Sequence, residues 1–120
     1  MENIQVFGIP NCTSVKKARV WLQERGLAHD FHDFKKQGLP EVELDRWLQT
    51  VSWEVLLNRK GTTWRSLTVA QQAAVVDAPS ARAAMLARPQ LVKRPVLVAG
   101  QQVIVGVNPG AWSGVKPSTP

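Results

Sequence analysis

The apolar and polar positions at the start of the chain predict a strand followed by a helix. Residues 4–7 (IQVF) have strand character, and the glycine, proline and asparagine within residues 8–11 mark the end of that strand. From residue 13 to residue 22, apolar residues recur on one helical face while lysine and glutamine cover much of the other side. Gly26 follows as a residue that can end the helix in a left-handed conformation.

The middle of the chain predicts a second strand and then a block of helices. Phe31 and Phe34, set among histidines and aspartates, indicate a strand near the surface. Residues 58–63 (NRKGTT) read as a basic turn between helical segments. The helical segments themselves begin at Pro40, Trp53, Thr68 and Pro79, and the last of them ends near Arg88.

The end of the chain predicts a β-hairpin and a last short helix. Two apolar runs, 96–98 and 103–105, are separated by a turn at Gly100. Pro109 then begins a helix that contains Trp112, and residues 116–120 (KPSTP) are expected to form a disordered tail. The order of elements is therefore strand, helix, strand, helical block, hairpin and helix.

This order predicts an α/β protein with a thioredoxin-like fold. A βαβ unit and a ββα unit would share one mixed sheet, and a helical subdomain, residues 39–89 approximately, would be inserted between them. A chain of 120 residues fits one domain, which we place at residues 1–115.

Composition narrows the cellular setting. No run of apolar residues is long enough to cross a membrane, and the first residues lack the basic and apolar segments of a secretory signal. The single cysteine, Cys12, cannot form a disulfide within the chain, which suits a reducing compartment. We therefore expect a cytoplasmic, monomeric protein that does not associate with membranes.

The formal net charge of +6 favours anionic partners. The basic residues are spread as short pairs along the chain, and no helix-turn-helix, zinc-finger or aromatic RNA-binding pattern accompanies them. Direct nucleic-acid binding is therefore not expected. A small anionic ligand or an acidic protein surface fits this distribution of charge better, although such a surplus is also typical of an ordinary solvated surface.

Cys12 is the candidate nucleophile. A single cysteine is commonly a buried apolar residue, but this one follows a Gly/Pro loop and directly precedes a helix. Unpaired backbone N–H groups and the positive end of the helix dipole stabilise a thiolate at such a position. Thr13 and Ser14 add hydroxyl groups, one of which could instead cap the helix, and Lys16 adds positive charge.

A second candidate is Arg94, which precedes Pro95 at the start of an apolar strand. Proline is tolerated at the first position of a strand. Thioredoxin-like proteins have a cis proline at this place, against the active cysteine, and the resemblance to them implies that the Arg94–Pro95 peptide bond is cis and lies against Cys12. The guanidinium would then stabilise the thiolate or bind an anionic substrate through paired N–H groups. The alternative is an ordinary surface arginine.

Other side chains are weaker candidates. His29 and His32 lie three residues apart in a predicted strand, so they point to opposite faces and no shared metal site is expected. Trp64 and Trp112 are candidates for the wall of a ligand groove, with simple packing as the alternative. Arg59, in the basic turn, could bind a carboxylate, and a solvated turn is the alternative there.

Taken together, several segments resemble the arsenate reductase (ArsC) and Spx-like family of thioredoxin-fold proteins, over nearly the whole chain. The resemblance is closest to the YffB subgroup, whose members are regarded as glutathione-dependent thiol reductases. The segments are VFGIPNCTSVKKARVWL, FHDFKKQGL, VLLNRKGTTWRSL, RPQLVKRPVLV and VGVNP.

The resemblance implies a monothiol oxidoreductase with glutathione as co-substrate and no bound cofactor or metal. Cys12 and Arg94 match the family's nucleophile and one of its arginines. The residues expected to bind the thiol or disulfide substrate are Asn11, Thr13, Ser14, Lys16, Arg59 and Pro95.

Two other family activities fit this chain less well. Family members that reduce arsenate have a histidine and two further arginines, where this chain has Gly8, Glu54 and Asn108. A site that lacks those cations should bind arsenate poorly. Spx-like regulators bind the C-terminal domain of the RNA polymerase α subunit, and many carry a Cys-x-x-Cys switch. This chain has Val15 at the second cysteine position, so it has no such switch.

Overall fold

The computed structural model describes residues 4–115, which form two compact units. One unit comprises the described residues up to Gln37 and from Arg94 onward, and the other comprises Gly38–Lys93. The helical insertion predicted at about 39–89 falls within the second unit. The single domain predicted at 1–115 stays a prediction, and the tail predicted at 116–120 lies outside the described residues.

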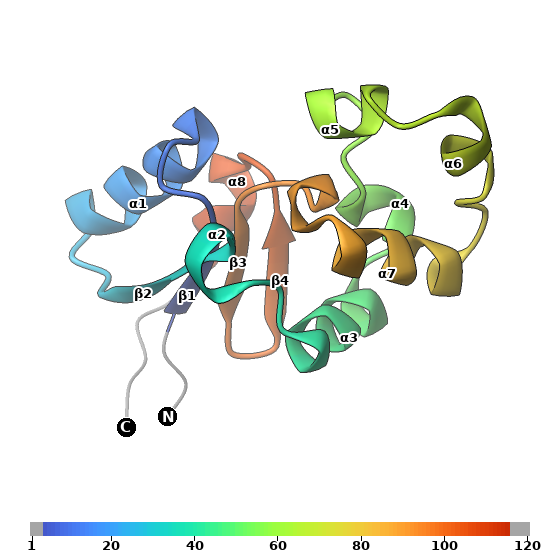
Figure 1. Cartoon of the computed structure of the whole chain (residues 1–120). Helices are drawn as coiled ribbons and strands as arrows, with labels where there is room; N and C mark the ends of the chain where they lie inside the picture. The colour runs from blue at the N-terminus through green and yellow to red at the C-terminus, as the bar shows by residue number, and fades with distance from the viewer. Residues whose placement is uncertain (1–3, 116–120) are drawn as a thin grey trace. The chain divides into compact units, whose positions relative to one another are not determined.

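A four-stranded mixed sheet forms the centre of the first unit (Figure 1). β1 (Ile4–Gly8) runs parallel to β2 (His29–Asp33) and antiparallel to β3 (Val96–Ala99). β4 (Gln102–Val105) pairs with β3 as a hairpin, which gives the order β2-β1-β3-β4. The chain therefore has the mixed sheet of the predicted thioredoxin-like α/β fold.

Side chains that alternate along the strands divide this sheet into two faces. On one face, α1 (Thr13–Glu24) and α8 (Pro109–Trp112) pack against the strands around a shared apolar cluster. α2 (Phe34–Gln37) directly follows β2, and its Phe34 ring lies near the rings of Phe7 and His32. The buried cluster contains Ile4, Val6, Val15, Ala18, Leu22, Leu97, Ala99, Trp112 and Val115.

The second unit is helical apart from one isolated β-bridge between Leu57 and Val92. Its buried residues include Leu44, Trp47, Leu56 and Met85, which form an apolar interior. Its elements are α3 (Glu41–Thr50), α4 (Trp53–Leu56), α5 (Thr62–Arg65), α6 (Val69–Ala73), α7 (Ala78–Ala87) and the 3-10 helix η1 (Pro89–Leu91).

Side-chain caps explain where several of these short helices begin. The side chains of Ser52, Thr68 and Asp77 each accept a hydrogen bond from a backbone N–H in the first turn of the following helix. Thr68 and Asp77 belong to reciprocal capping boxes, in which the third helical residue bonds back to the cap. Local chemistry therefore fixes the starts of helices that are too short to be stable alone.

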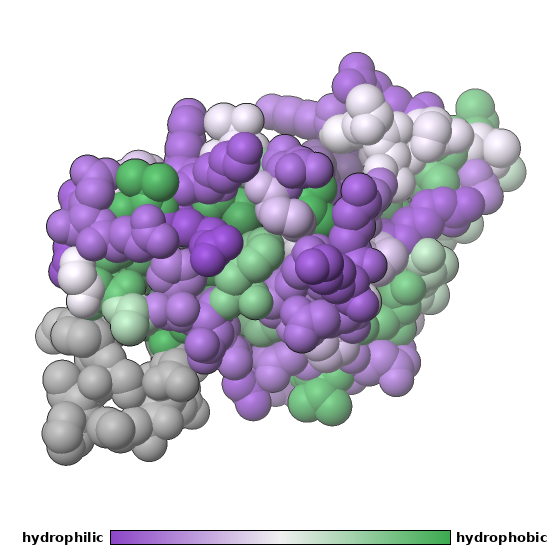
Figure 2. Space-filling view, turned by 60° about the vertical axis from the view of Figure 1, so that its left-hand side comes forward, coloured by the Kyte–Doolittle hydropathy of each residue, from purple (hydrophilic) through white to green (hydrophobic). Residues whose placement is uncertain are grey.

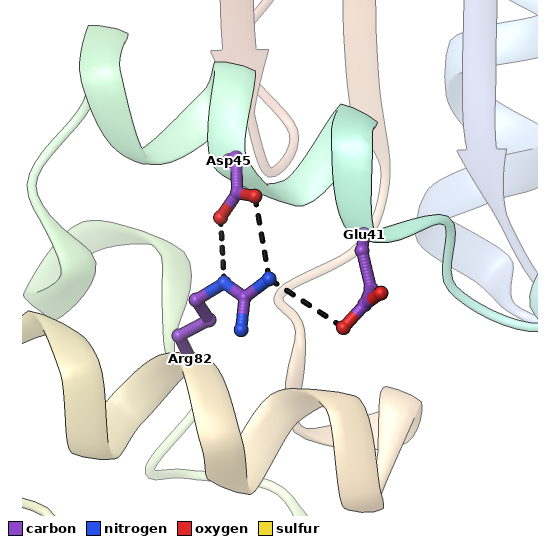
Figure 3. A network of polar contacts seen from close by, with 3 residues as sticks. All are labelled: Glu41, Asp45 and Arg82. Carbon is purple, nitrogen blue, oxygen red and sulfur yellow. Dashed lines mark hydrogen bonds and ion pairs between the residues drawn. The ribbon is translucent and has the colours of Figure 1, made fainter.

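An ion network joins α3 to α7 in the second unit (Figure 3). The Arg82 guanidinium donates from Nε to Asp45 Oδ1 at 2.6 Å and from Nη2 to Asp45 Oδ2 at 3.3 Å. Its Nη2 also lies 3.5 Å from Glu41 Oε1. The planar guanidinium thus bonds one carboxylate with two nitrogens, a geometry that lysine cannot reproduce.

The structure corrects several of the helix and strand boundaries that were predicted from the sequence. The predicted second strand ends at Asp33, because Phe34 begins the short helix α2. Two further short elements, α5 and η1, lie in segments for which no helix was predicted. The helix that begins after Thr68 ends at Ala73, earlier than its alanine-rich sequence suggests. The predicted helix at 13–22, the hairpin and the last helix are confirmed.

Candidate functional site

Cys12 occupies the N-cap position of α1 in the first unit. Its backbone is extended, with φ −99° and ψ 123°, and its carbonyl accepts the first helical hydrogen bond from Lys16 N–H at 3.0 Å. The Cys12 N–H donates to the Ile9 carbonyl at 3.4 Å, which closes the loop between β1 and α1. The side chain is partly buried and packs against the cluster between the helix and the sheet.

The surroundings of the sulfur favour its thiolate form. Partial burial raises the pKa of the Cys12 thiol, because it removes water from the charged form. The backbone N–H groups of Val15 and Ser14, and the hydrogen bond and charge of the Arg94 guanidinium, lower the pKa and together outweigh the burial. The net pKa of Cys12 therefore lies below its ordinary value. The sulfur makes no regular capping bond, so these N–H groups act on it as nearby dipoles.

The sheet explains how Arg94 comes close to Cys12. Phe7 in β1 pairs with Val96 in β3, so the loop that follows β1 and the segment that precedes β3 leave the same edge of the sheet. The Arg94–Pro95 peptide bond is cis, as the sequence predicted. Pro95 is buried, and its carbonyl accepts a hydrogen bond from Gly106 N–H at 2.8 Å.

Gly8 is required at the end of β1 by the packing of α1. A Cβ atom on Gly8 would lie 2.5 Å from Cγ2 of Val15, which is closer than two carbon atoms can approach. Val15 is buried, and its N–H is one of the groups that face the Cys12 sulfur. Because Gly8 has no side chain, α1 can begin close to the sheet, and the N–H groups at the start of α1 can lie near the Cys12 sulfur.

Four of the residues predicted to bind substrate lie within four positions of Cys12 in the sequence. Asn11 and Thr13 are exposed on either side of Cys12, and Ser14 is partly buried. Lys16 is exposed on the first turn of α1. Their roles toward a substrate stay predictions.

Arg59, the remaining residue predicted to bind substrate, belongs to the second unit. Its guanidinium lies over the rings of Trp53 and Trp64, at 5.3 and 6.0 Å from their centroids. The segment around it is only partly a turn, because α5 begins at Thr62. Trp64 thus contacts a cation of its own unit, and a role for Arg59 toward a carboxylate stays a prediction.

The histidines that were considered as metal ligands have other contacts. His29 Nε2 accepts a hydrogen bond from Arg19 Nε at 3.2 Å. Burial, and then the charge of Arg19, lower the pKa of His29, which keeps this imidazole in its neutral form. The His32 ring lies 5.1 Å from that of Phe7. Within residues 4–115, no group of three His, Cys, Asp or Glu side chains could hold a metal ion, and no helix could span a membrane.

Asn108 and Glu54 are the two residues that were expected from the sequence at the positions of family arginines, and their surroundings in the structure differ. Asn108 caps α8, and its Oδ1 accepts a hydrogen bond from Ala111 N–H at 3.1 Å. Glu54 lies in the first turn of α4, in the second unit, where a carboxylate complements the helix dipole. Neither position supplies a cation.

One feature of this region was not predicted from the sequence, and a second was predicted only in part. The close approach of Gly8 and Val15 depends on how the helix packs against the strand, which residue types alone do not report. A groove of about 420 Å³ also lies along α1, beginning at Thr13, and its lining includes Trp112, Val20 and Val107. Trp112 was named from the sequence as a candidate for the wall of a ligand groove, and Trp112 does line this one, whereas Trp64 does not. The extent of the groove along α1 was not predicted.

Comparison with known proteins gives a family match over nearly the whole chain. The model of the ArsC family matches residues 7–115. This range includes Cys12, the cis Arg94–Pro95 bond, the whole second unit and most of the first.

Solved structures and curated sequences agree with that match. The structure of a protein named YffB is 42% identical with a TM-score of 0.89, and the match covers 94% of this chain and 98% of that one. An arsenate reductase (ArsC) related protein from Brucella melitensis is 48% identical with a TM-score of 0.73, covering 93% and 92% of the two chains. The global transcriptional regulator Spx of Streptococcus agalactiae is 30% identical over 108 residues, which cover 88% of this chain and 77% of Spx.

Proposed function

Because this chain belongs to the ArsC family, we propose that it is a thiol oxidoreductase that uses Cys12 as its nucleophile and glutathione as its co-substrate. The observation that carries the proposal is the position of the sulfur at the start of α1, with the Arg94 guanidinium and two backbone N–H groups directed at it. These groups favour a thiolate at neutral pH, and the thiolate is the form that attacks disulfides.

The reaction begins with attack of the Cys12 thiolate on one sulfur of a substrate disulfide. A new S–S bond forms between Cys12 and that sulfur, and the second sulfur leaves as a thiolate with the electron pair of the broken bond. Arg94 would act at this step by holding the attacking sulfur in its charged form, and it could also bind a carboxylate of the substrate through its N–H groups.

Release of the product requires an external thiol, because Cys12 is the only cysteine in the chain. Attack of a glutathione thiolate on the mixed disulfide forms a new disulfide and returns Cys12 as a thiolate. This cycle consumes one glutathione and leaves a disulfide between glutathione and the substrate half that Cys12 carried. Attack of a second glutathione thiolate on that disulfide releases the substrate thiolate and forms glutathione disulfide, so that in total two glutathione molecules are oxidised and the substrate disulfide is reduced. Glutathione is an anion at neutral pH, and the basic side chains of Arg94 and Lys16 suit it.

Reduction of arsenate is disfavoured for this chain. The positions of a histidine and two arginines in arsenate-reducing relatives hold Gly8, Glu54 and Asn108, so the site lacks the cations that would neutralise an oxyanion. Asn108 in addition uses its side-chain oxygen to cap α8. Arsenate, the substrate in the names of some relatives, is therefore not proposed as a substrate of this chain.

A turnover assay tests the proposal. The protein is mixed with a small mixed disulfide and reduced glutathione, and formation of glutathione disulfide is followed against the uncatalysed rate. We expect acceleration by the wild-type chain and none by Cys12→Ser, which preserves size and removes the nucleophile. Equal rates with the two proteins would disprove the proposed activity.

The similarity to Spx supports a second candidate function, a regulator that binds RNA polymerase. That relative is named a global transcriptional regulator, and the match to it covers 88% of this chain. Val15 at the second cysteine position means that such binding could not depend on an internal disulfide. A pull-down with the C-terminal domain of the polymerase α subunit tests it: retention of wild type and Cys12→Ser alike supports this candidate, and no retention removes it.

A further inference from the structure

A groove beside Cys12 has the chemistry of a peptide-binding site. It has a volume of about 420 Å³ and runs along α1 from Thr13, the residue after Cys12, to Glu24 at the other end of the helix. The opposite wall comes from the segment before α8 and from α8 itself. All of these residues belong to the first unit, so the groove is formed within one compact body.

Apolar side chains form the floor and walls of this groove. The rings of Trp21 and Trp112 lie 5.7 Å apart and join α1 to α8 across it. Val20 and Val107 also line it, and they are 49% and 43% exposed. In the space-filling view, hydrophobic residues are exposed between hydrophilic ones on the side of the molecule that faces the viewer (Figure 2). An apolar ligand would remove both valines from water.

Positive charge lies at the end of the groove that is nearest to Cys12. Lys16 and Lys17 both line it there, both are exposed, and neither forms an ion pair within residues 4–115. Glu24 lies at the far end, next to Arg25, whose guanidinium stacks over Trp21 at 4.0 Å from the ring centroid. The far end is therefore close to neutral, and the end near the sulfur is cationic.

We propose that this groove binds the acidic and apolar segment of a protein substrate whose oxidised cysteine is attacked by Cys12. The inference rests on the thiol chemistry proposed above and adds the class of substrate. Carboxylates next to the reacting cysteine would face Lys16 and Lys17, and apolar side chains further along the segment would lie on Val20 and the tryptophans. Charge complementarity selects this occupant over a basic or neutral segment.

The length of the groove suits a short extended peptide. Residues 13 and 24 are separated by about 16 Å along the axis of α1 at 1.5 Å per residue. An extended chain advances about 3.3 Å per residue, so about five residues fit alongside the helix. Glutathione is a tripeptide and would leave the far part of the groove empty, so a longer segment uses the available surface more fully.

The test measures how fast Cys12 accepts different peptides. Each probe is a mixed disulfide with thionitrobenzoate, so that attack joins the probe to Cys12 and releases the coloured thiolate as the better leaving group. One peptide has a central cysteine flanked by aspartates with leucines beyond them, and a second has lysines in place of the aspartates. A neutral mercaptoethanol probe reports the intrinsic reactivity of the thiolate. We expect the acidic peptide to react several-fold faster than the basic one, after division by the rate of the neutral probe.

Matched variants test whether the difference in rate between the two peptides comes from the groove. Lys17→Glu should lower the rate of the acidic peptide by up to roughly fivefold, the upper end of the range for an exposed charge pair, and leave the neutral probe unchanged. Lys36→Glu makes the same charge change on α2, outside the groove, and should leave both rates unchanged. Val20→Ser should slow the acidic peptide, while Val42→Ser, an exposed valine on α3, should not.

The outcomes separate this inference from the proposed function. Equal rates for the two peptides, or equal effects of Lys17→Glu and Lys36→Glu, would overturn the peptide site while leaving the thiol chemistry intact. An equal loss with oxidised glutathione in Lys17→Glu would assign the groove to glutathione instead. If Cys12 reacts with no probe, the thiol function fails, and the groove is then tested by binding of fluorescent forms of the two peptides to Cys12→Ser. Tighter binding of the acidic peptide, with the difference lost when Lys17→Glu is added, supports the site. Equal binding of the two peptides refutes it.

Discussion

The guanidinium of Arg94 donates a hydrogen bond to the sulfur of Cys12, although all the residues of the second unit lie between them in the sequence. The pairing of β1 with β3 brings their segments to one edge of the sheet. The reactivity of the only cysteine in the chain is therefore a property of the assembled sheet as well as of the helix that begins beside it.

Replacing Arg94 with alanine should raise the pKa of the Cys12 thiol. Wild-type Cys12 should titrate below the ordinary value of about 8.5, because N–H dipoles and the guanidinium favour the thiolate. The pH dependence of alkylation by iodoacetamide measures both values. Arg88→Ala, which removes an exposed arginine at the end of α7, should leave the titration unchanged. A wild-type pKa at or above the ordinary value would contradict the activation of Cys12.

Exposure to glutathione disulfide should add one glutathione to each chain. Cys12 is partly exposed and is the only thiol, so a single mixed disulfide forms and no internal disulfide can displace it. Mass spectrometry of the intact protein measures the adduct, which excess reduced glutathione should remove. The Cys12→Ser protein is the control and should gain no mass. An unmodified wild-type protein would show that the sulfur is inert toward this disulfide.

Gly8→Ala should destabilise the protein by about 1–3 kcal/mol, the usual effect of forcing an atom into a packed interior. The new methyl group would meet Val15 Cγ2 at 2.5 Å, so α1 would have to move away from β1. Unfolding in urea measures the change. Gly114→Ala is the matched control, because the nearest atom to its Cβ would be the Ala111 carbonyl oxygen at 3.5 Å.

A double variant checks that Val15 is the cause. Val15→Ala removes Cγ2, so Gly8→Ala should cost less in that background than in the wild type. If the losses of stability in the two single variants add up in the double variant, the strain caused by Gly8→Ala does not come from contact with Val15 Cγ2. Displacement of α1 should also move the Ser14 and Val15 N–H groups, so Gly8→Ala alone should raise the pKa of Cys12.

The bond between Asp45 and Arg82 should make stability depend on pH in the acid range. Hydrogen bonding to Arg82, and then its charge, lower the pKa of Asp45 in the folded protein. The carboxylate therefore adds stability above its unfolded pKa of about 3.9, and this contribution is lost as the pH falls through the lower folded pKa. Thermal unfolding of wild type and Asp45→Asn should differ at neutral pH and converge in acid. A difference between the two proteins that stays the same from neutral pH to acid would contradict this role of the Asp45 carboxylate.

The sequence predicted the elements that have a strong period and clear end signals. The run from Val15 to Leu22 repeats at helical spacing, and the valine-rich hairpin is divided by Gly100, so both were located correctly. Phe34 was misassigned because an aromatic residue after a strand suits either continuation or a helical turn. The short helices α5 and η1 contain about one turn each, and a single turn has no period that a sequence pattern can reveal.

The candidate site could be predicted only in part for a similar reason. Cys12 is recognisable because its neighbours in the sequence form the start of a helix, and Arg94 is recognisable by its position before Pro95. The contact between Gly8 and Val15 and the groove along α1 depend on the distance between a helix and its neighbours in space. Residue types and spacing do not specify such distances.

The central place of β1 in the sheet has a consequence for the newly made protein. Its antiparallel neighbour β3 begins at Val96, so a ribosome must complete most of the chain before β1 gains that partner and Arg94 arrives beside Cys12. An unfinished or truncated molecule lacks that cation at its sulfur. Fast labelling of the cysteine would thus distinguish finished molecules from fragments.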